Sequence, residues 1–174
     1  MLFMDDTRIK NFTSCFKEKK FLEFFFKRVK FNDTGRYQEE FPYVSPCGRE
    51  KNYIRCDDLP IVFTHFLTKD SIEHLSYGYT DNLLTVKFEP GKLCMFPLSG
   101  RVYHPGPQKV GGVGLIKSAL AIEISPYFRF SPEDPDHQNC PTHFDWKGTT
   151  YSLSNELVES LSQLSQTAKM SKCE

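Results

Sequence analysis

The sequence predicts one domain of the α+β class, built from a mostly antiparallel sheet or a partial barrel with an amphipathic helix near each end. Three observations support this prediction. The chain has 174 residues, which is enough for one large hydrophobic core. Hydrophobic residues make up 39% of it and charged residues 25%, as in ordinary folded proteins. Many of its 16 Phe and 8 Tyr residues lie in short runs separated by Pro and Gly, a pattern typical of strands joined by turns.

The first part of the chain is expected to form a short strand and then an amphipathic helix. Residues 1–4 are apolar, and Asp5 and Asp6 offer side chains that cap helices. Apolar residues on either side of a charged break at 17–20 then recur at helical spacing, which places them on one helix face. They are Ile9, Phe12, Phe16, Leu22, Phe25, Phe26 and Val29.

The middle of the chain is expected to form strands and one long loop. Short aromatic and β-branched runs at 37–67 predict antiparallel strands, with clear alternation at 52–56. Residues 83–88 and 93–96 flank a Pro-Gly pair, which favours a type II turn and therefore predicts a hairpin. Residues 101–114 are rich in Gly and Pro, and we expect them to form a surface loop.

In the last part, alternation at 115–124 favours a strand, with a helix as the alternative. A hairpin is expected around Lys147-Gly148, after a polar loop at 131–142. A final amphipathic helix should follow Ser154 or Asn155, and 168–174 should form a frayed tail, so that the domain covers 1–167. Both ends then read as strand, cap and helix, which would be consistent with two strand-helix repeats.

Charge and composition exclude several classes of protein. Lys plus Arg equals Asp plus Glu at 22 each, so no net field draws the molecule to nucleic acid or to an anionic membrane. No apolar run approaches the roughly 20 residues that span a bilayer. The six Cys residues contain no CxxC pair, and we expect them to be reduced. The basic run at 17–30 contains Phe at helical spacing, which indicates core packing rather than RNA binding.

The main candidate site is a cluster of ionisable residues. Six of them fall within seventeen positions: Arg49, Glu50, Arg55, Asp57, Asp58 and His65. Strand alternation would place Arg55 and Asp57 on one face. The cluster could hold an anion through its arginines or a cation through its carboxylates, or act as a general acid and base. The alternative is a solvated network of ion pairs at a strand end.

Two further motifs contain residues that are typical of binding sites. Gly111-Gly-Val-Gly-Leu could expose backbone N–H groups to a phosphate, but the spacing from Gly114 to Lys117 does not fit a Walker loop. Positive φ or close packing against the sheet explains such glycines, and we keep Gly112 and Gly114 as ligand-binding candidates beside the cluster. His137, Cys140 and His143 lack an evident fourth ligand, so we predict no metal site.

Four segments carry a family resemblance: Cys47 to Asp58, Asp5-Asp-Thr-Arg, Gly35-Arg-Tyr and Gly111-Gly-Val-Gly-Leu. They resemble a eukaryotic family of unknown function, whose human member is named only as an open reading frame on chromosome 8. Members of that family usually begin with a mitochondrial presequence, so the resemblance implies a mitochondrial protein. No such presequence stands before Leu2 in this sequence. Without the resemblance, we would expect a cytoplasmic protein. Asp57-Asp58-Leu59-Pro60 is also similar to a bacterial domain of unknown function, which implies repeated strand-helix motifs and an unproven role in signalling or ligand binding.

We expect a non-catalytic mitochondrial domain that binds a ligand or a protein partner around residues 49–58 and Gly112. The first alternative is a small hydrolase or transferase in which Asp57 or Asp58 acts as base and Arg49 or Arg55 steadies an anion. The second is a structural subunit of a mitochondrial assembly, with an exposed apolar patch. The sequence identifies neither a cofactor nor a particular ligand or partner.

Overall fold

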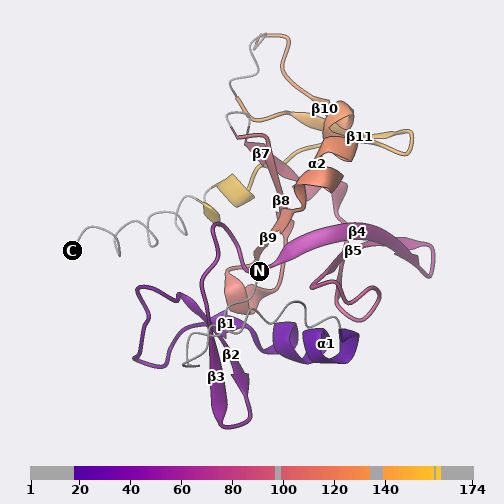
Figure 1. Cartoon of the computed structure of the whole chain (residues 1–174). Coiled ribbons are helices and arrows are strands. Elements are labelled where there is room, and N and C mark those ends of the chain that lie inside the picture. The colour runs from indigo at the N-terminus through magenta and orange to yellow at the C-terminus, as the bar shows by residue number, and fades with distance from the viewer. Residues whose placement is uncertain (1–17, 97–98, 134–138, 159, 162–174) are drawn as a thin grey trace.

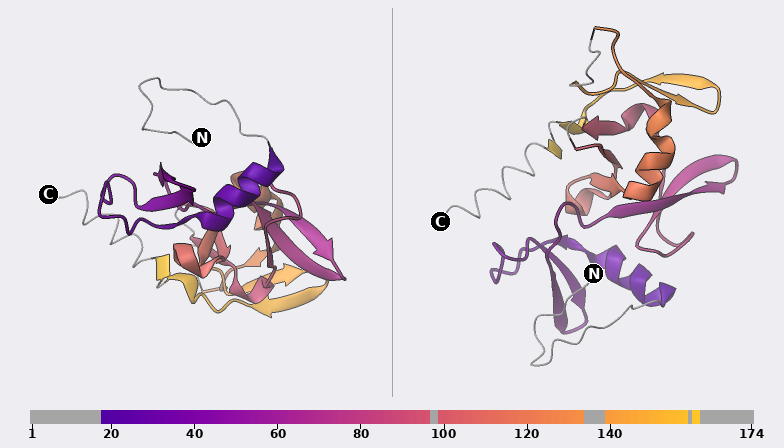
Figure 2. Two further views of the ribbon diagram at one scale, coloured as in Figure 1. Left: turned by 90° about the horizontal axis from the view of Figure 1, so that it is seen from below. Right: turned by 45° about the horizontal axis from the view of Figure 1, so that its top comes forward.

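The computed structural model describes residues 18–96, 99–133, 139–158 and 160–161 (Figure 1). Over these residues it is an α+β structure in which strands predominate. Its α-helices with defined bounds are α1 (Lys19–Arg28) and α2 (Ser118–Ile124), and residues 157–158 and 160–161 are also helical. The two helices lie on opposite sides of the hairpin made by β4 (Val62–Lys69) and β5 (Ile72–Tyr77), as Figure 1 and the right panel of Figure 2 show.

Two of the three sheets in the described part of the chain are small and antiparallel. One has the strand order β1, β2, β3, and the other has the order β10, β11, β12. Their bounds are β1 Lys30–Phe31, β2 Tyr43–Cys47, β3 Glu50–Ile54, β10 Phe128–Arg129, β11 His143–Trp146 and β12 Thr149–Ser152. The β11–β12 hairpin confirms the turn predicted at Lys147-Gly148.

The third sheet has six strands in the order β6, β5, β4, β9, β8, β7. The new strands are β6 (Thr85–Lys87), β7 (Cys94–Phe96), β8 (Arg101–Pro105) and β9 (Val113–Ile116). The β4–β9 pair is parallel, and the other pairs are antiparallel. The mostly antiparallel character is therefore confirmed, but the sheet is open and does not form a closed barrel.

The open sheet is strongly curved. Phe88 donates its backbone N–H to Glu73 O on β5, and the next residue, Glu89, donates its N–H to His104 Nε2 on β8 at 3.0 Å. In the strand order, β4 and β9 separate β5 from β8. Phe88 and Glu89 are neighbours in the chain, and they can contact both β5 and β8 only because the sheet bends around them. They belong to the segment that joins β6 to β7, the two edges of the sheet.

The predicted hairpin of 83–88 with 93–96 is wrong. Residues 90–92 form a 3-10 helix, η1 (Pro90–Lys92), and the strands on either side are the opposite edges of the six-stranded sheet. β6 pairs with β5, and β7 pairs with β8. The Pro-Gly pair does lie in a turn, in which Lys92 N–H donates to Glu89 O. Leu93 and Cys94 are fully buried in the core, and burial decides which strands pair.

Two other predictions between 101 and 124 are corrected. The expected loop at 101–114 contains strand β8, a 3-10 helix η2 (Gln108–Val110) and the start of β9. The expected strand at 115–124 ends at Ile116, and the helix alternative is right from Ser118 onward. The helix buries Leu120, Ala121 and Ile124 and leaves Ile122 71% exposed, so the alternation of apolar residues there does not follow burial.

The expected terminal helices are not shown as such. The predicted strand at 1–4, the stripe at 9–16, and the end of the last helix with its tail lie outside the described residues. Within α1, Phe25 is buried, and Phe21 and Phe26 pack against the same core, as predicted for the phenylalanines of this segment. Lys109 donates to the carbonyls of Phe26 and Lys27, and thus caps the end of α1.

The larger of the two hydrophobic clusters among the described residues joins the three sheets and both helices. It extends from Phe25 on α1 to Phe144 on β11 and Leu153 after β12. His104 is fully buried within it, with Phe63 and Phe88 as ring neighbours. Its Nε2 accepts from Glu89 N–H, and its Nδ1 lies 2.8 Å from Pro105 O. Both ring nitrogens are therefore satisfied, which assigns His104 a structural role.

Candidate functional site

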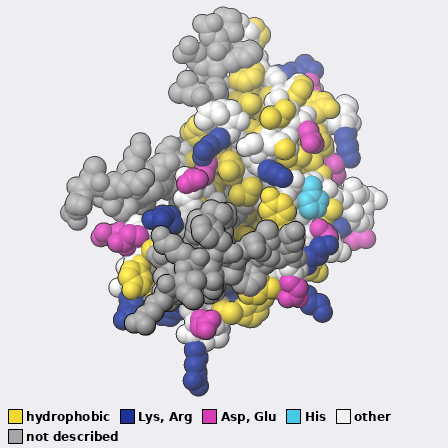
Figure 3. All heavy atoms as spheres, viewed as in Figure 1, with side chains coloured by type: hydrophobic (Ala, Val, Ile, Leu, Met, Phe, Trp, Pro, Cys, Tyr) yellow, Lys and Arg dark blue, Asp and Glu magenta, His cyan; other side chains and the backbone are white. Residues whose placement is uncertain are grey.

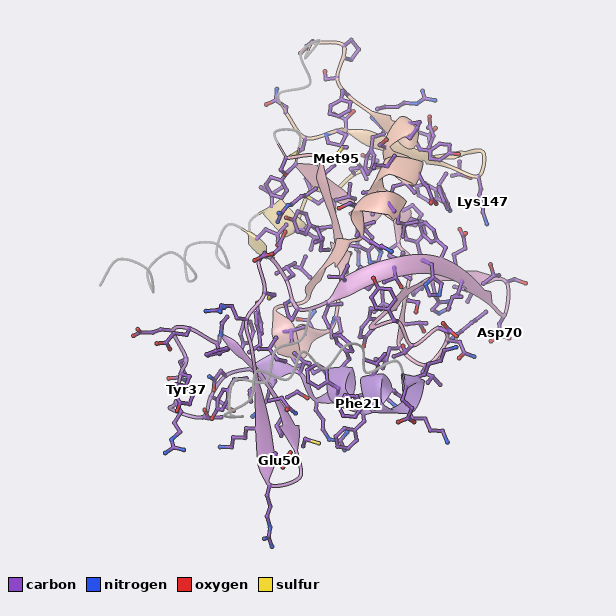
Figure 4. All side chains as sticks on the ribbon, viewed as in Figure 1. Phe21, Tyr37, Glu50, Asp70, Met95 and Lys147 are labelled. Atoms are coloured by element: carbon purple, nitrogen blue, oxygen red, sulfur yellow. The ribbon has the colours of Figure 1, made fainter. Side chains whose placement is uncertain are left out.

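The predicted ionisable cluster divides among three places in the fold. Arg49 and Glu50 lie at the turn of the β2–β3 hairpin and are exposed. Glu50 is at the free end of that hairpin, away from the rest of the molecule (Figure 4). Because β3 runs from Glu50 to Ile54, the turn and the residues after the strand are separated by about 13 Å of extended chain.

Arg55, Asp57 and Asp58 follow β3 and do not continue it, because the strand ends at Ile54. The expected alternation of faces at 55–57 therefore does not apply. Arg55 is exposed, and its guanidinium carbon lies 5.4 Å from the ring centroid of Phe41. Asp57 is also exposed, whereas the side chain of Asp58 is only 16% exposed. Asp58 is thus the one of the three that is turned into the protein.

Asp58 contacts two residues of β8 that the sequence analysis did not select. Arg101 donates from Nη1 to Asp58 Oδ2, and the Tyr103 hydroxyl donates to the same oxygen at 2.9 Å. The carboxylate raises the pKa of the Arg101 guanidinium through this hydrogen bond. Burial, and then the bond to Asp58, raise the pKa of Tyr103 to about 12. The three side chains form a charged, hydrogen-bonded unit that we call the Asp58 triad.

Asp58 also lies close to Cys56 and Tyr43. The Cys56 thiol lies 3.6 Å from Asp58 O. Burial, followed by the charges of Asp58 and Asp57, raises the pKa of Cys56 to about 11. Burial also raises the pKa of Tyr43 to about 12, with Cys56 and Asp58 contributing. Both groups are therefore neutral near pH 7, and this thiol lacks the depressed pKa of a catalytic nucleophile.

The remaining predicted residues lie elsewhere. His65 is on β4, opposite Ser76 of β5, with its Nδ1 2.9 Å from Thr64 Oγ1. Gly112 has φ +71° and accepts a backbone hydrogen bond from Gly106 N–H, which closes the turn between β8 and β9. Gly114 packs so closely on Phe63 that an added Cβ would lie 2.5 Å from the ring. The geometry of these glycines is the tight approach to the sheet that the sequence predicted.

A groove borders the Asp58 triad on the side of Arg101. It has a volume of about 490 Å³ and lies between β7, β8, β9 and α2. The apolar side chains lining it are Met95, Leu115, Ile116, Ala121 and Ile122. The polar side chains lining it are Arg101, Ser99, Ser118 and Ser125. Figure 3 is viewed as Figure 1, and where α2 lies it shows a surface of hydrophobic side chains with single charged groups among them.

The groove can hold an apolar group beside a hydrogen-bond acceptor. Its volume falls in the range of small-molecule sites, about 300 to 1,000 Å³. Arg101 is 49% exposed, and Asp58 uses only part of its donor capacity, because a guanidinium carries five N–H groups. Asp58 and Tyr103 hold Arg101 in one position, so less conformational entropy is lost when it binds another group.

The described residues contain no group of three or more His, Cys, Asp and Glu side chains that could hold a metal ion. In the same part of the chain, no helix is long and apolar enough to cross a membrane.

Comparison with known proteins identifies a family but no fold relative. No solved structure matches the chain. The family model of the domain of unknown function DUF4505 matches residues 1–158, which is most of the 174-residue chain. The chain therefore belongs to the DUF4505 family.

Proposed function

We propose that this chain is a non-catalytic domain that binds a ligand or a protein partner in the groove beside α2. The observation that carries the proposal is Arg101, half exposed at an apolar groove and held from behind by Asp58 and Tyr103. Arginine is one of the residues that contribute most to binding energy at protein surfaces, and covering an exposed apolar side chain adds a hydrophobic contribution. Ile122, 71% exposed on the same groove, is such an apolar side chain.

The occupant should combine an apolar side chain with a carbonyl or carboxylate oxygen. The apolar part would displace water from Met95, Leu115 and Ile122, and the oxygen would accept hydrogen bonds from Arg101. A short segment of a partner protein has both features. Asp58 already neutralises much of the charge of Arg101, so a strongly anionic ligand gains little here, and we favour an apolar peptide segment.

The hydrolase or transferase alternative has less support. It needs Asp57 or Asp58 to act on one substrate together with Arg49 or Arg55. Arg49 lies at the hairpin turn, and Arg55 lies over Phe41. Arg101 and Tyr103 both donate to Asp58 Oδ2, so this oxygen does not act as a base without breaking the ion pair.

Native purification followed by mass spectrometry tests the proposal. The full chain is isolated with its bound molecules, the captured species is identified, and its affinity for the purified protein is then measured. Ile122→Glu should weaken binding about tenfold or more, because it places a charge against the apolar part of the occupant. Ile72→Glu is the matched control, since Ile72 is also exposed but lies at the β4–β5 turn.

A second pair of variants isolates the role of the guanidinium. Arg101→Gln removes the donor group from the groove, whereas Arg129→Gln removes an arginine that is likewise paired with an aspartate, Asp145, outside the groove. Weaker binding in Arg101→Gln and Ile122→Glu, with both controls unchanged, would support the proposal. Equal binding by all four variants would reject the groove as the site.

We also propose that the protein acts in mitochondria. The support is the likeness of Cys47 to Asp58, and of the three shorter segments, to the eukaryotic family with mitochondrial members. Protease protection of the protein in fractionated cells tests this. The proposal would be contradicted if the protein were recovered in the cytosolic fraction and the protease digested it there without added detergent.

A further inference from the structure

A second group of polar side chains gathers at a bulge in β4, outside the α2 groove. The register between β4 and β5 shifts between Phe63 and His65, so Thr64 is the extra residue of the bulge. Bulges turn side chains away from the regular alternation and are frequent beside functional sites. Here the bulge brings the Thr64 hydroxyl to 2.9 Å from His65 Nδ1, and the hydroxyl also lies 3.4 Å from Ser76 O.

These bonds define the available donor of His65. With the Thr64 hydroxyl donating to Ser76 O, Thr64 Oγ1 accepts from His65 Nδ1–H. The other ring nitrogen, Nε2, has no hydrogen-bond partner among the described residues. A protonated His65 can therefore present Nε2–H to a ligand, since the side chain is half-buried and in contact with solvent.

The parallel strand β9 brings a lysine to the same place. Lys117 donates its backbone N–H to Phe63 O at 2.8 Å, so it lies directly beside the bulge. Its ammonium is exposed and lies 5.7 Å from the ring centroid of Tyr79. None of the ion pairs within the described residues involves Lys117. The charge of Lys117 is therefore available to an anion.

A rigid loop presents Tyr79 next to this lysine. Tyr79 and Asp81 have φ of 56° and 52°, a conformation that residues other than glycine seldom adopt. Thr80 is fully buried between them and holds the loop, because its hydroxyl donates to Tyr77 O and accepts from Leu84 N–H. The loop leaves Tyr79 62% exposed. Strained conformations of this kind are frequent at binding sites.

The net charge at the bulge is positive. Asp81 faces His65, but Lys19 forms an ion pair with Asp81 and lowers the pKa of its carboxyl, with a smaller contribution from His65. Lys69 is directed to Asn82 O and Thr85 Oγ1. The Lys19–Asp81 pair adds no net charge, and so the positive charge of Lys117 remains.

We propose that the bulge site, formed by Thr64, His65, Tyr79 and Lys117, binds the phosphate group of a small aromatic phosphomonoester. Lys117 and protonated His65 supply charge-assisted hydrogen bonds to the phosphate oxygens. Tyr79 supplies an exposed ring on which the aromatic part can stack. This site is independent of the α2 groove, and either can exist without the other.

Nuclear magnetic resonance at pH 6.5 tests the proposal with inorganic phosphate and phenyl phosphate as probes. Both should cause saturable shifts of the His65 and Tyr79 ring signals, and phenyl phosphate should bind severalfold more tightly because of stacking. Vesicles with and without phosphatidic acid form a third arm, which distinguishes a lipid headgroup from a soluble phosphomonoester. Binding only to the phosphatidic acid vesicles would overturn the assignment to a small ligand.

Matched variants identify the residues. Lys117→Met and His65→Gln should each weaken phenyl phosphate binding about tenfold, the effect of losing one charged hydrogen bond. Lys87→Met and His74→Gln are the controls, because Lys87 pairs with His74, which lies opposite Leu67, beyond the bulge at Thr64. Unchanged spectra elsewhere verify that the variants fold. Absence of saturable shifts in the wild-type protein, or equal loss in the control variants, would overturn the proposal.

Discussion

Trp146 donates its indole N–H to the carboxylate of Glu73, with 2.6 Å between Nε1 and Oε2. Lys147, the next residue, places its ammonium 2.8 Å from the other carboxylate oxygen. Glu73 lies on β5, and Trp146 ends β11. One carboxylate therefore ties the C-terminal hairpin to the six-stranded sheet, where the Trp146 ring also packs on Phe66 and Phe88.

Glu73→Ala should lower the free energy of unfolding by about 2 kcal/mol, because it removes two bonds to a charged group and leaves the indole N–H without its partner. The control is Glu89→Ala, which breaks the exposed pair with Lys92. That change should cost less than about 1 kcal/mol. Chemical denaturation followed by tryptophan fluorescence measures both, and equal losses would show that Glu73 is only a surface charge.

Gly114→Ala should destabilise the protein by about 1 to 3 kcal/mol through overpacking, because the new Cβ would lie 2.5 Å from Phe63 Cε2 and 3.1 Å from Ile61 Cγ2. Phe63→Leu leaves room for that methyl group. The double variant should therefore lose less stability than the sum of the two single losses. Additive losses in thermal denaturation would mean that the contact between Gly114 and Phe63 does not set the requirement for glycine.

Local signals account for the features that the sequence predicted. The hairpin at Lys147-Gly148 follows from its turn residues, and the close packing of Gly114 from the absence of a side chain. Pairing over long distances was not accessible. Pro90-Gly91 looks like a hairpin turn, but the strands beside it join partners elsewhere in the sheet, which no local pattern records. At 118–124, the alternation of apolar residues predicted a strand, but the segment forms a helix because this places Leu120 and Ile124 in the core.

The candidate site was found only in part for the same reason. Asp58 was selected from its neighbours in sequence, but its partners Arg101 and Tyr103 are 43 and 45 positions away. Arg49 and Glu50 are close to Asp58 along the chain and apart in space, because a strand lies between them. The alternation of Arg101, Val102, Tyr103 and His104 in a strand was the available signal, and the surrounding Gly and Pro residues concealed it.

Acid should destabilise the fold through His104. Burial lowers the pKa of this imidazole from 6.5 to about 4, so the folded protein holds it neutral while the unfolded chain protonates it below pH 6.5. Its contribution to stability is complete above pH 6.5 and is lost as the pH falls toward 4, up to about 3 kcal/mol. His104→Gln cannot titrate, so its free energy of unfolding should fall less over this range. Identical pH dependence in the two proteins would contradict this role.

The ionised carboxylate of Asp58 should control the reactivity of Cys56. At a pKa of about 11, raised by burial and then by Asp58 and Asp57, about one thiol in a thousand is ionised at pH 8. Asp58→Asn removes the charge that contributes more to the pKa shift and should speed alkylation of Cys56 by iodoacetamide severalfold, as read by mass spectrometry of the peptide that contains Cys56. Asp57→Asn should speed it less, because Asp57 contributes less to the pKa shift.

Cys94, fully buried with a pKa raised to about 12, reports whether either variant has opened the core. A faster reaction of Cys56 while Cys94 stays protected assigns the change to electrostatics, and equal rates in both variants would show that burial alone sets the reactivity of Cys56.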